Sequence, residues 1–254
     1  MAVVTGASRG IGRATALALG REGASVVAVG RDAAALESLA GELREMGGGV
    51  LPVVCDVSRK AEVDRLAEAA YREYPAVHLL VNNAAEYPVT PFLEMTEEQW
   101  DAVLDINLKG PFLVSQAFAL RMVARGAGGK IVNVSSCAAV VARPGIAHYA
   151  SSKAGLNQLT KVLAVELAPY GIAVNAVSPG LIGTERVKQL SVTTSAEHET
   201  KMSRIPMARM GSPKEMAAAI MFLLGEGSSY VTGSVLFADG GYSCGIPSYG
   251  GSEK

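Results

Sequence analysis

The sequence predicts a single doubly wound α/β domain, in which a parallel sheet of seven strands carries helices on both faces. Short β-branched runs alternate with longer Ala- and Leu-rich segments of helical period along the whole chain. The chain has 254 residues, of which 49% are hydrophobic but only 6% aromatic, and 28 are glycine. This composition suits one large core with close helix-to-sheet packing, so residues 1–254 are expected to form one domain.

The strand candidates are short apolar runs, most of them bounded by Gly, Asn, Ser or Asp. They are expected at residues 2–5, 25–30, 50–55, 79–82, 130–135, 173–178 and 235–238. Parallel strands joined by right-handed crossovers leave a ligand crevice at their carboxyl ends. We therefore expect the functional residues to follow the strands.

Helices are expected between the strands, where apolar residues recur with helical period. The expected ranges are 11–20, 33–46, 60–74, 96–124, 147–170 and 212–224. Thr96 and Gln99 have the spacing of a capping box at the start of one of them. The polar stretch 185–206 is longer than a usual strand-to-helix loop and predicts a substrate lid, although a surface loop without function has the same composition. The Gly/Ser-rich residues 245–254 are expected to form a tail.

The charge balance and the scattered cysteines exclude several classes of function. The 23 Lys+Arg residues nearly balance 24 Asp+Glu residues, which argues against a nucleic-acid partner. No apolar run has the length of a membrane span, and the N-terminal residues do not resemble a signal peptide, so a cytoplasmic protein is expected. The three cysteines and three histidines lie far apart, so neither a disulfide framework nor a metal site is predicted.

A glycine-rich turn joins the first strand to the first helix. Gly6, Gly10 and Gly12 have the spacing G-x-x-x-G-x-G. Glycines here permit a tight turn, let the backbone approach a pyrophosphate and leave free amides at a helix N-terminus. The spacing differs from the G-x-G-x-x-G fingerprint, so the turn indicates a Rossmann-type dinucleotide site without proving one.

The end of the second strand indicates which dinucleotide is bound. An acid there would bind the ribose 2′-hydroxyl of NAD(H), but this chain has Gly30 followed by Arg31. Arg31 can form charge-assisted bonds to a 2′-phosphate, and Arg9 could reach the same group, so NADP(H) is favoured over NAD(H). Asp32 argues the other way, because an acid at the ribose would repel the phosphate.

Tyr149 and Lys153 are four residues apart at the start of a predicted helix and therefore share one face. A tyrosine near its reference pKa of about 10 is a poor acid or base at neutral pH, and a nearby ammonium group would lower that pKa. The pair is common by chance. The other motifs decide its interpretation.

The sequence resembles the short-chain dehydrogenase/reductase family in its single-domain form. The resemblance covers nearly the whole chain and depends on several motifs in the family's order. Besides the glycine turn, Tyr149 and Lys153, these are Asp56, Asn82 to Ala85, Asn107, Ser135 and Ser136, Pro179 and Gly180, and Asp239 to Gly241.

This resemblance implies a catalytic set. Tyr149 would be the general acid that protonates the carbonyl oxygen, or the base in the reverse direction, and Ser136 would hydrogen-bond that oxygen. Ser135 is the rival serine, but its spacing to Tyr149 fits less well. Lys153 would hold the nicotinamide ribose and, with the cofactor's positive ring, lower the pKa of Tyr149. Asn107 would hold a water that links Lys153 to solvent.

The resemblance also implies a cofactor set. The glycine turn would bind the pyrophosphate, Arg31 the 2′-phosphate, Asp56 the adenine and Asn83 the adenosine, and the segment from Pro179 would frame the carboxamide. The full set is Gly6, Ser8, Arg9, Gly10, Ile11, Gly12, Arg31, Asp56, Val57, Asn83, Tyr149, Lys153, Pro179, Gly180, Ile182 and Thr184.

Taken together, these features predict an NADP(H)-dependent oxidoreductase for a small ketone, a sugar or polyol, or a cyclic alcohol. A 3-oxoacyl-(acyl-carrier-protein) reductase is the alternative, but such enzymes tend to place Arg near the end of the helix after the catalytic Tyr, where this chain has Pro169, Tyr170 and Gly171. A catalytically silent NADP(H) sensor is a further alternative, which the intact catalytic set disfavours. The resemblance also implies a homotetramer assembled through the helices at 96–124 and 147–170 and the last strand.

Overall fold

The computed structural model describes residues 1–126, 128–185 and 202–245. Its seven strands form one parallel sheet in the order β3-β2-β1-β4-β5-β6-β7, which confirms the predicted fold class. The strands are β1 (Ala2–Thr5), β2 (Val26–Gly30), β3 (Val50–Val54), β4 (Leu79–Asn82), β5 (Gly129–Val134), β6 (Ile172–Pro179) and β7 (Val235–Ala238).

The strand order reverses direction at the centre of the sheet. The chain starts in β1, winds outward to β3, and then returns to β4 on the other side of β1. Loops that leave the carboxyl ends of β1 and β4 therefore diverge, and they open a crevice between them.

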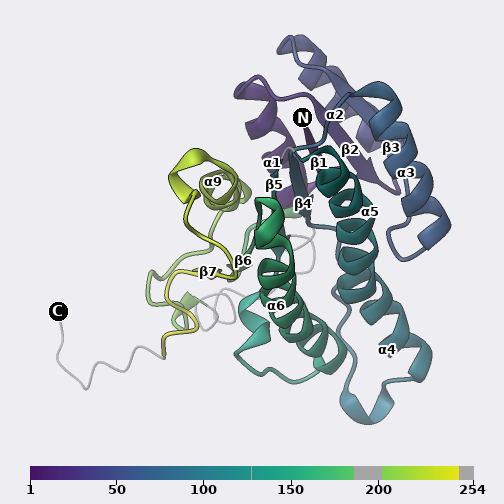
Figure 1. The fold of residues 1–254 in the computed structure, drawn as a ribbon. Coiled ribbons are helices and arrows are strands. Elements are labelled where there is room, and N and C mark those ends of the chain that lie inside the picture. Colours follow the sequence, from purple (N-terminus) through teal and green to yellow (C-terminus); the bar gives the residue numbers. More distant parts are fainter. Residues whose placement is uncertain (127, 186–201, 246–254) are drawn as a thin grey trace.

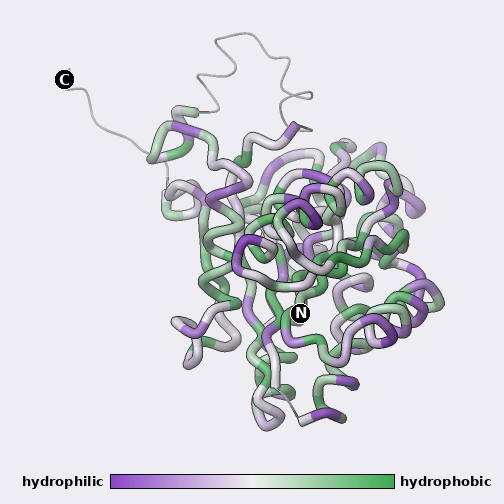
Figure 2. Tube along the Cα trace, turned by 90° about the horizontal axis from the view of Figure 1, so that it is seen from above, coloured by the Kyte–Doolittle hydropathy of each residue, from purple (hydrophilic) through white to green (hydrophobic). Residues whose placement is uncertain are grey.

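Helices cover both faces of the sheet (Figure 1). They are α1 (Gly10–Arg21), α2 (Ala33–Glu45), α3 (Lys60–Glu73), α4 (Glu97–Leu104), α5 (Gly110–Arg125), α6 (Ala147–Leu167) and α9 (Pro213–Leu224). One core packs α3, α5 and α6 against the sheet, and a second core packs α1, α2 and α9 against its other face. The hydrophobic strands are thus enclosed between helices whose outer residues are more polar (Figure 2).

Two helix starts show the local chemistry that the sequence encodes. Thr96 accepts a hydrogen bond from the Gln99 amide, and the Gln99 side chain accepts one from the Thr96 amide, so the predicted capping box is present. Ser212 and Glu215 form a second box before α9. Each box satisfies two backbone donors that the first helical turn cannot pair.

The predicted continuous helix at 96–124 is wrong in one respect. A π-helical segment, Asp105–Lys109, separates α4 from α5. Such a segment holds one more residue in its turn than an α-helix, which changes the direction of its side chains. The residue so placed is Asn107, which is fully buried. Likewise, the helix expected at 147–170 leaves the α-helical geometry at Leu167 and ends in a 3₁₀ turn, Ala168–Tyr170.

Most of the expected lid at 185–206, and nearly all of the expected tail at 245–254, lie outside the described residues. At the base of that stretch, a single parallel bridge joins Ile182 to Gly211. Among the described residues, no helix is long and apolar enough to cross a membrane.

Candidate active site

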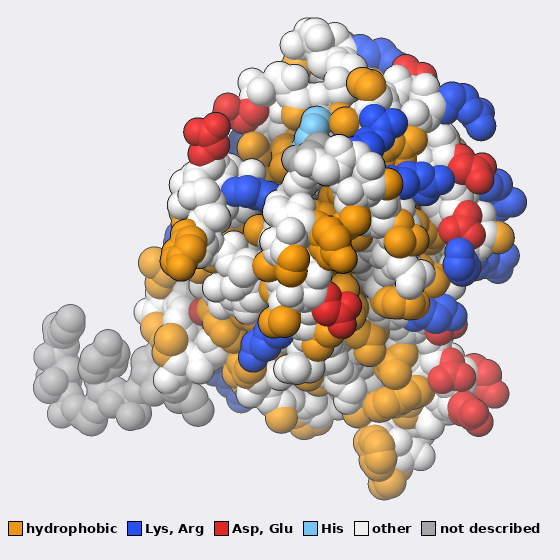
Figure 3. Space-filling view, viewed as in Figure 1, with side chains coloured by type: hydrophobic (Ala, Val, Ile, Leu, Met, Phe, Trp, Pro, Cys, Tyr) orange, Lys and Arg blue, Asp and Glu red, His pale blue; other side chains and the backbone are white. Residues whose placement is uncertain are grey.

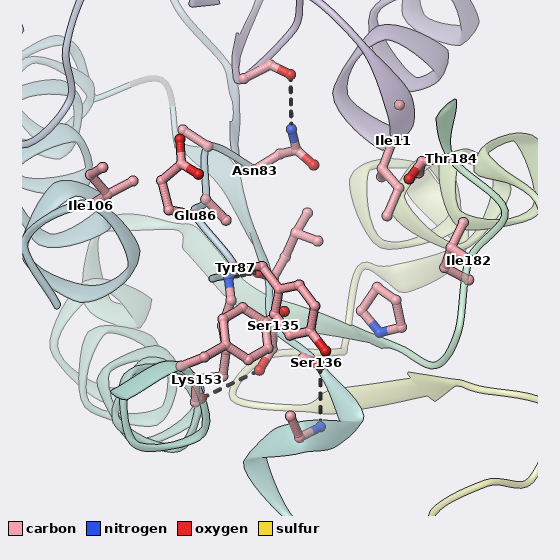
Figure 4. A pocket seen from close by; sticks show the side chains of 18 of the residues that line it. Ile11, Asn83, Glu86, Tyr87, Ile106, Ser135, Ser136, Lys153, Ile182 and Thr184 are labelled. Carbon is pink, nitrogen blue, oxygen red and sulfur yellow. Dashed lines mark hydrogen bonds between the residues drawn. The ribbon is translucent and has the colours of Figure 1, made fainter. Parts of the chain in front are cut away.

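A cavity of about 1010 Å³ lies at the carboxyl ends of the strands. Figure 4 shows Ile11, Ile182 and Thr184 on one wall, Glu86 and Ile106 on the opposite one, and Tyr87, Ser136 and Lys153 between them. The predicted site residues that line the cavity are Gly6, Ser8, Arg9, Gly10, Ile11, Arg31, Asp56, Val57, Asn83, Ser136, Tyr149, Lys153, Pro179, Gly180, Ile182 and Thr184. Gly12 and Asn107 are the two predicted site residues outside that lining.

The glycine turn is built by close backbone contacts. Gly6 has φ +64° and Gly10 has φ +57°, a left-handed conformation that favours glycine. A Cβ at Gly12 would lie 2.2 Å from the Gly6 carbonyl oxygen. The Asn83 side chain donates hydrogen bonds to the carbonyls of Thr5 and Gly6, at 3.0 and 3.1 Å. Asn83 therefore anchors the turn as well as lining the cavity.

The start of α1 fits an anionic ligand. No side chain caps this end, and no acidic residue lies in its first turn. Gly10 and Ile11, which begin the helix, line the cavity. Backbone N–H groups and the positive end of the helix dipole thus face the cavity without a carboxylate of α1 competing for them, as a pyrophosphate site requires.

Arg31 forms an ion pair with Glu86 from the loop after β4. Both residues line the cavity, with side chains 58% and 25% exposed. Sequence patterns could not indicate this pair, because its two members are 55 positions apart along the chain. Asp32, the counter-argument to NADP(H), caps α2 by accepting a hydrogen bond from the Ala35 amide at 3.0 Å. Its carboxylate is therefore engaged at the helix start.

Asp56, the residue expected at the adenine, follows β3 and lines the cavity. Its carboxylate accepts hydrogen bonds from the Ser58 amide at 3.0 Å and the Ser58 hydroxyl at 2.7 Å. Burial raises its pKa, but these bonds and the charges of Arg31 and Arg59 outweigh burial and hold the pKa below the ordinary value. Asp56 is therefore ionised at neutral pH and rigidly held.

Tyr149, Ser136 and Lys153 meet at the centre of the cavity. The Tyr149 side chain is hydrogen-bonded with the Ser136 hydroxyl, and the Lys153 ammonium nitrogen lies 5.8 Å from the centre of the Tyr149 ring. Lys153 is 2% exposed and donates to the Val134 carbonyl at 2.8 Å. Ser135 instead donates to the Lys153 carbonyl at 3.3 Å, so it serves the strand end. The geometry pairs Ser136 with Tyr149, as the spacing favours.

Burial dominates the electrostatics of this centre. It raises the pKa of the Tyr149 phenol, while the bond with Ser136 acts in the opposite direction. It also lowers the pKa of Lys153 to about 7. Lys153 is therefore only partly charged at neutral pH in the protein without cofactor. The lowering of the Tyr149 pKa by Lys153 together with the positive nicotinamide ring stays a prediction. Tyr149 holds its proton.

Asn107 connects the loop after β4 to the catalytic helix. Its side chain accepts from the Glu86 amide and donates to the Glu86 carbonyl, both at 2.9 Å, and it donates to the Ser152 hydroxyl at 3.2 Å. Ser152 in turn donates to the Tyr149 carbonyl at 2.7 Å. Sequence reasoning missed Ser152, whose only signal was its position three residues after Tyr149.

A second aromatic contact extends the centre toward the cavity mouth. The rings of Tyr87 and Tyr149 meet edge to face, with centroids 4.5 Å apart and planes at 75°. The guanidinium carbon of Arg143 lies 5.5 Å from the Tyr87 ring centre. Sequence reasoning also missed Arg143, although it lies between the two predicted catalytic positions, Ser136 and Tyr149.

Cys137 and His148 are the sequence neighbours of Ser136 and Tyr149. Burial raises the pKa of the Cys137 thiol to about 11, which suppresses the thiolate. His148 is fully buried and accepts a hydrogen bond from the Tyr149 amide at 2.8 Å, a helix-start role. Within the described ranges, no group of three or more His, Cys, Asp or Glu side chains is arranged to hold a metal ion.

The chain resembles known oxidoreductases along nearly its whole length. A family model described as enoyl-(acyl carrier protein) reductase matches residues 6–243. The chain is 42% identical to the 3-oxoacyl-(acyl-carrier-protein) reductase FabG of Thermotoga maritima, over 94% of this chain and 96% of that one. It is 41% identical to an L-rhamnose 1-dehydrogenase (NAD(P)(+)) of Azotobacter vinelandii, over 94% of each chain.

Solved structures agree with these relatives. A gluconate 5-dehydrogenase of Burkholderia cenocepacia, in complex with NADP and tartrate, superposes with a TM-score of 0.91 at 34% identity, over 96% of this chain and 95% of that one. Sequence and fold agree with the same group of relatives across nearly the whole chain. The chain therefore belongs to the short-chain dehydrogenase/reductase family and is an oxidoreductase that acts on alcohols and carbonyl compounds.

Proposed function

We propose that this protein is an NADP(H)-dependent oxidoreductase that interconverts a carbonyl group and an alcohol. Its substrate is a small ketone, a sugar or polyol, or a cyclic alcohol. The observation that carries this proposal is the meeting of Tyr149, Ser136 and Lys153 in one cavity with the uncapped start of α1. A proton donor and an anion site for the cofactor then face the same space.

The chain's own groups handle the oxygen of the substrate. Tyr149 keeps its proton at neutral pH and can deliver it to a carbonyl oxygen that becomes negative, and the Ser136 hydroxyl donates to the same oxygen. Lys153 has a pKa of about 7, so it can take up or release a proton close to the Tyr149 ring. When bound, NADP(H) supplies or accepts the hydride.

The preference for NADP(H) is supported by Arg31 and by the absence of an acid at Gly30, where β2 ends. A 2′-phosphate between Arg31 and Ser8 would meet a guanidinium and a hydroxyl. Glu86 pairs with the same guanidinium, and its carboxylate would repel the phosphate. The two anions therefore compete for Arg31.

Glu86→Gln is expected to tighten the binding of 2′,5′-ADP about fivefold, because one partly exposed negative charge near a phosphate costs ~1 kcal/mol. The binding of 5′-AMP, which lacks the 2′-phosphate, should change little. Calorimetric titration of both nucleotides measures the effect. Glu185→Gln, the same change in another acid that lines the cavity, is the control. Equal tightening in both variants would contradict a specific competition for Arg31.

A reductase of 3-oxoacyl groups on acyl carrier protein is the second candidate, favoured by the 42% identity to the enzyme of Thermotoga maritima. In this chain, the segment after α6 presents a 52% exposed Tyr170 between Pro169 and Gly171. An acidic carrier protein finds no guanidinium at these three positions. A free substrate is therefore preferred.

The proposal is tested by following NADPH and NADH absorbance across a panel of ketones, diketones, ketoses and β-ketoacyl thioesters, including thioesters on acyl carrier protein. Turnover of a free carbonyl compound with NADPH is the expected result. Faster turnover with NADH would overturn the cofactor preference, and turnover confined to carrier-bound thioesters would establish the alternative. Cofactor binding without any turnover, in either direction, would favour the sensor.

We also propose assembly into a homotetramer through α4, α5 and α6 and the last strand. Figure 3 shows hydrophobic side chains exposed over these helices. Phe112, Leu120 and Val165 are 42, 68 and 78% exposed on α5 and α6, which is unusual for large apolar residues on a face with no role.

Cys55, Cys137 and Cys244 are free thiols, which fits a reducing cytoplasm as the site of action.

A further inference from the structure

Arg143 places a cation in the cavity, next to the contacting rings of Tyr87 and Tyr149. It belongs to the loop between Ser136 and α6 and lines the cavity. Its guanidinium lies over the Tyr87 ring, and that ring packs edge to face on Tyr149. A guanidinium held on an aromatic face loses part of its freedom before any ligand arrives. Arg143 is thus positioned beside the catalytic tyrosine.

The acids of the cavity do not neutralise this cation. The acidic side chains that line it in the described part of the chain are Asp32, Asp56, Glu86 and Glu185. None of the four forms an ion pair with Arg143. Asp32 is engaged at the start of α2 and Asp56 at Ser58, while Glu86 is paired with Arg31. The cation beside Tyr149 therefore keeps its capacity to bind an anion.

The cavity that Arg143 lines has a largely apolar wall. Its lining includes Val89, Val141, Ile146 and Ile205, while the Arg143 side chain is exposed and open to a ligand. Charge–charge interactions are stronger against such a wall than in bulk water, because fewer water molecules screen them. A planar guanidinium also matches a carboxylate with two parallel hydrogen bonds.

We propose that Arg143, held on the Tyr87 ring, binds a carboxylate of the substrate and selects keto acids and hydroxy acids whose reacting carbon lies at Tyr149. This inference rests on the proposed function and names its substrate class. The carboxylate must lie several bonds from the reacting carbon, since the Tyr87 ring separates Arg143 from Tyr149.

The test compares matched substrate pairs. A series of keto acids of increasing length and the corresponding keto amides is assayed with NADPH, and kcat/KM for each acid is divided by that for its amide. In the wild-type chain, kcat/KM for the acid is expected to exceed that for its amide. In Arg143→Met the ratio should fall about tenfold, mainly through KM, which corresponds to ~1.4 kcal/mol. Arg143→Lys should keep part of the ratio, because the charge remains and the planar fork is lost.

Two control variants locate the effect. Arg125→Met removes a guanidinium from a similar ring contact, 5.2 Å from the Tyr71 ring centre and outside the cavity lining, and should leave the ratio unchanged. Arg204→Met removes another cation that lines the cavity. If the ratio falls as far in Arg204→Met as in Arg143→Met, the assignment to Arg143 is overturned.

The inference and the proposed function fail in different ways. Turnover of neutral ketones with no preference for acids would overturn the inference and leave the function intact. A preference for sugar phosphates over keto acids would overturn the carboxylate assignment. If no carbonyl compound is reduced, the proposed function fails. Binding of an anion at Arg143 is then tested by thermal-shift titration with hydroxy acids and hydroxy amides. The acid should raise the melting temperature more than the amide in the wild-type chain, and this difference should be lost in Arg143→Met.

Discussion

Tyr149→Phe is expected to lower kcat by ~10³-fold, because the variant keeps the ring and loses the phenol hydroxyl that lies beside Ser136 and Lys153. The burial that raises the pKa of Tyr149 ensures that its phenol carries the proton before reduction. The loss should appear in both directions of the reaction. It is measured as kcat at saturating NADPH, and as kcat for the alcohol with NADP.

Tyr87→Phe is the matched control for this prediction. Tyr87 lies against Tyr149 with ring centroids 4.5 Å apart, so the same hydroxyl is removed from a neighbouring ring in the same cavity. Its kcat should fall less than tenfold, because the remaining ring still packs on Tyr149. An equal loss in both variants would assign the effect to packing or polarity of the cavity. A Tyr149→Phe enzyme with near wild-type kcat would remove Tyr149 from catalysis.

Gly12→Ala is expected to have the largest effect on stability and cofactor binding. The new Cβ would lie 2.2 Å from the Gly6 carbonyl oxygen and 2.4 Å from the Asn83 side-chain nitrogen. Backbone must move, and the turn loses the bonds from Asn83 that hold it. Overpacking of this kind costs about 1–3 kcal/mol. Urea unfolding and NADPH titration should therefore show lower stability and binding weakened more than tenfold.

Gly41→Ala shows why this result would be informative. Gly41 lies in α2, and nothing lies within 4 Å of a Cβ built there. In a helix interior, Ala is more favourable than Gly by about 0.5–1 kcal/mol, so Gly41→Ala should stabilise the protein. Helix propensity alone would predict the same sign for Gly12, which is in α1. A stabilised Gly12→Ala protein would show that the turn has room for a Cβ at Gly12 beside the Gly6 carbonyl.

The sequence was sufficient to predict the fold, and most of the predicted site residues line one cavity. The alternation of apolar runs and helical periods is a local property, and it predicted seven strands that the structure has within one or two residues. Residues that follow parallel strands are brought to one edge of the sheet by topology alone. That rule is why scattered positions such as Gly6, Asn83, Ser136 and Pro179 line one cavity.

Local patterns failed where the backbone departs from regular geometry. The run at 96–124 has continuous helical periodicity, but the structure inserts a π segment at Asp105–Lys109. Within that segment, Asn107 forms hydrogen bonds with Glu86 and Ser152. Those partners come from other elements, so the pattern within the helix could not indicate them.

The sequence by itself determined the sheet, the glycine turn at the start of α1, and the pairing of Tyr149 with Lys153, because each depends on spacing along one strand, turn or helix. Only the tertiary structure decided the ion pair of Arg31 with Glu86, the contact of Arg143 with Tyr87, and the dominance of burial over charge at Tyr149 and Lys153. These depend on distances between loops and on the exclusion of water, which are set by how the whole domain packs.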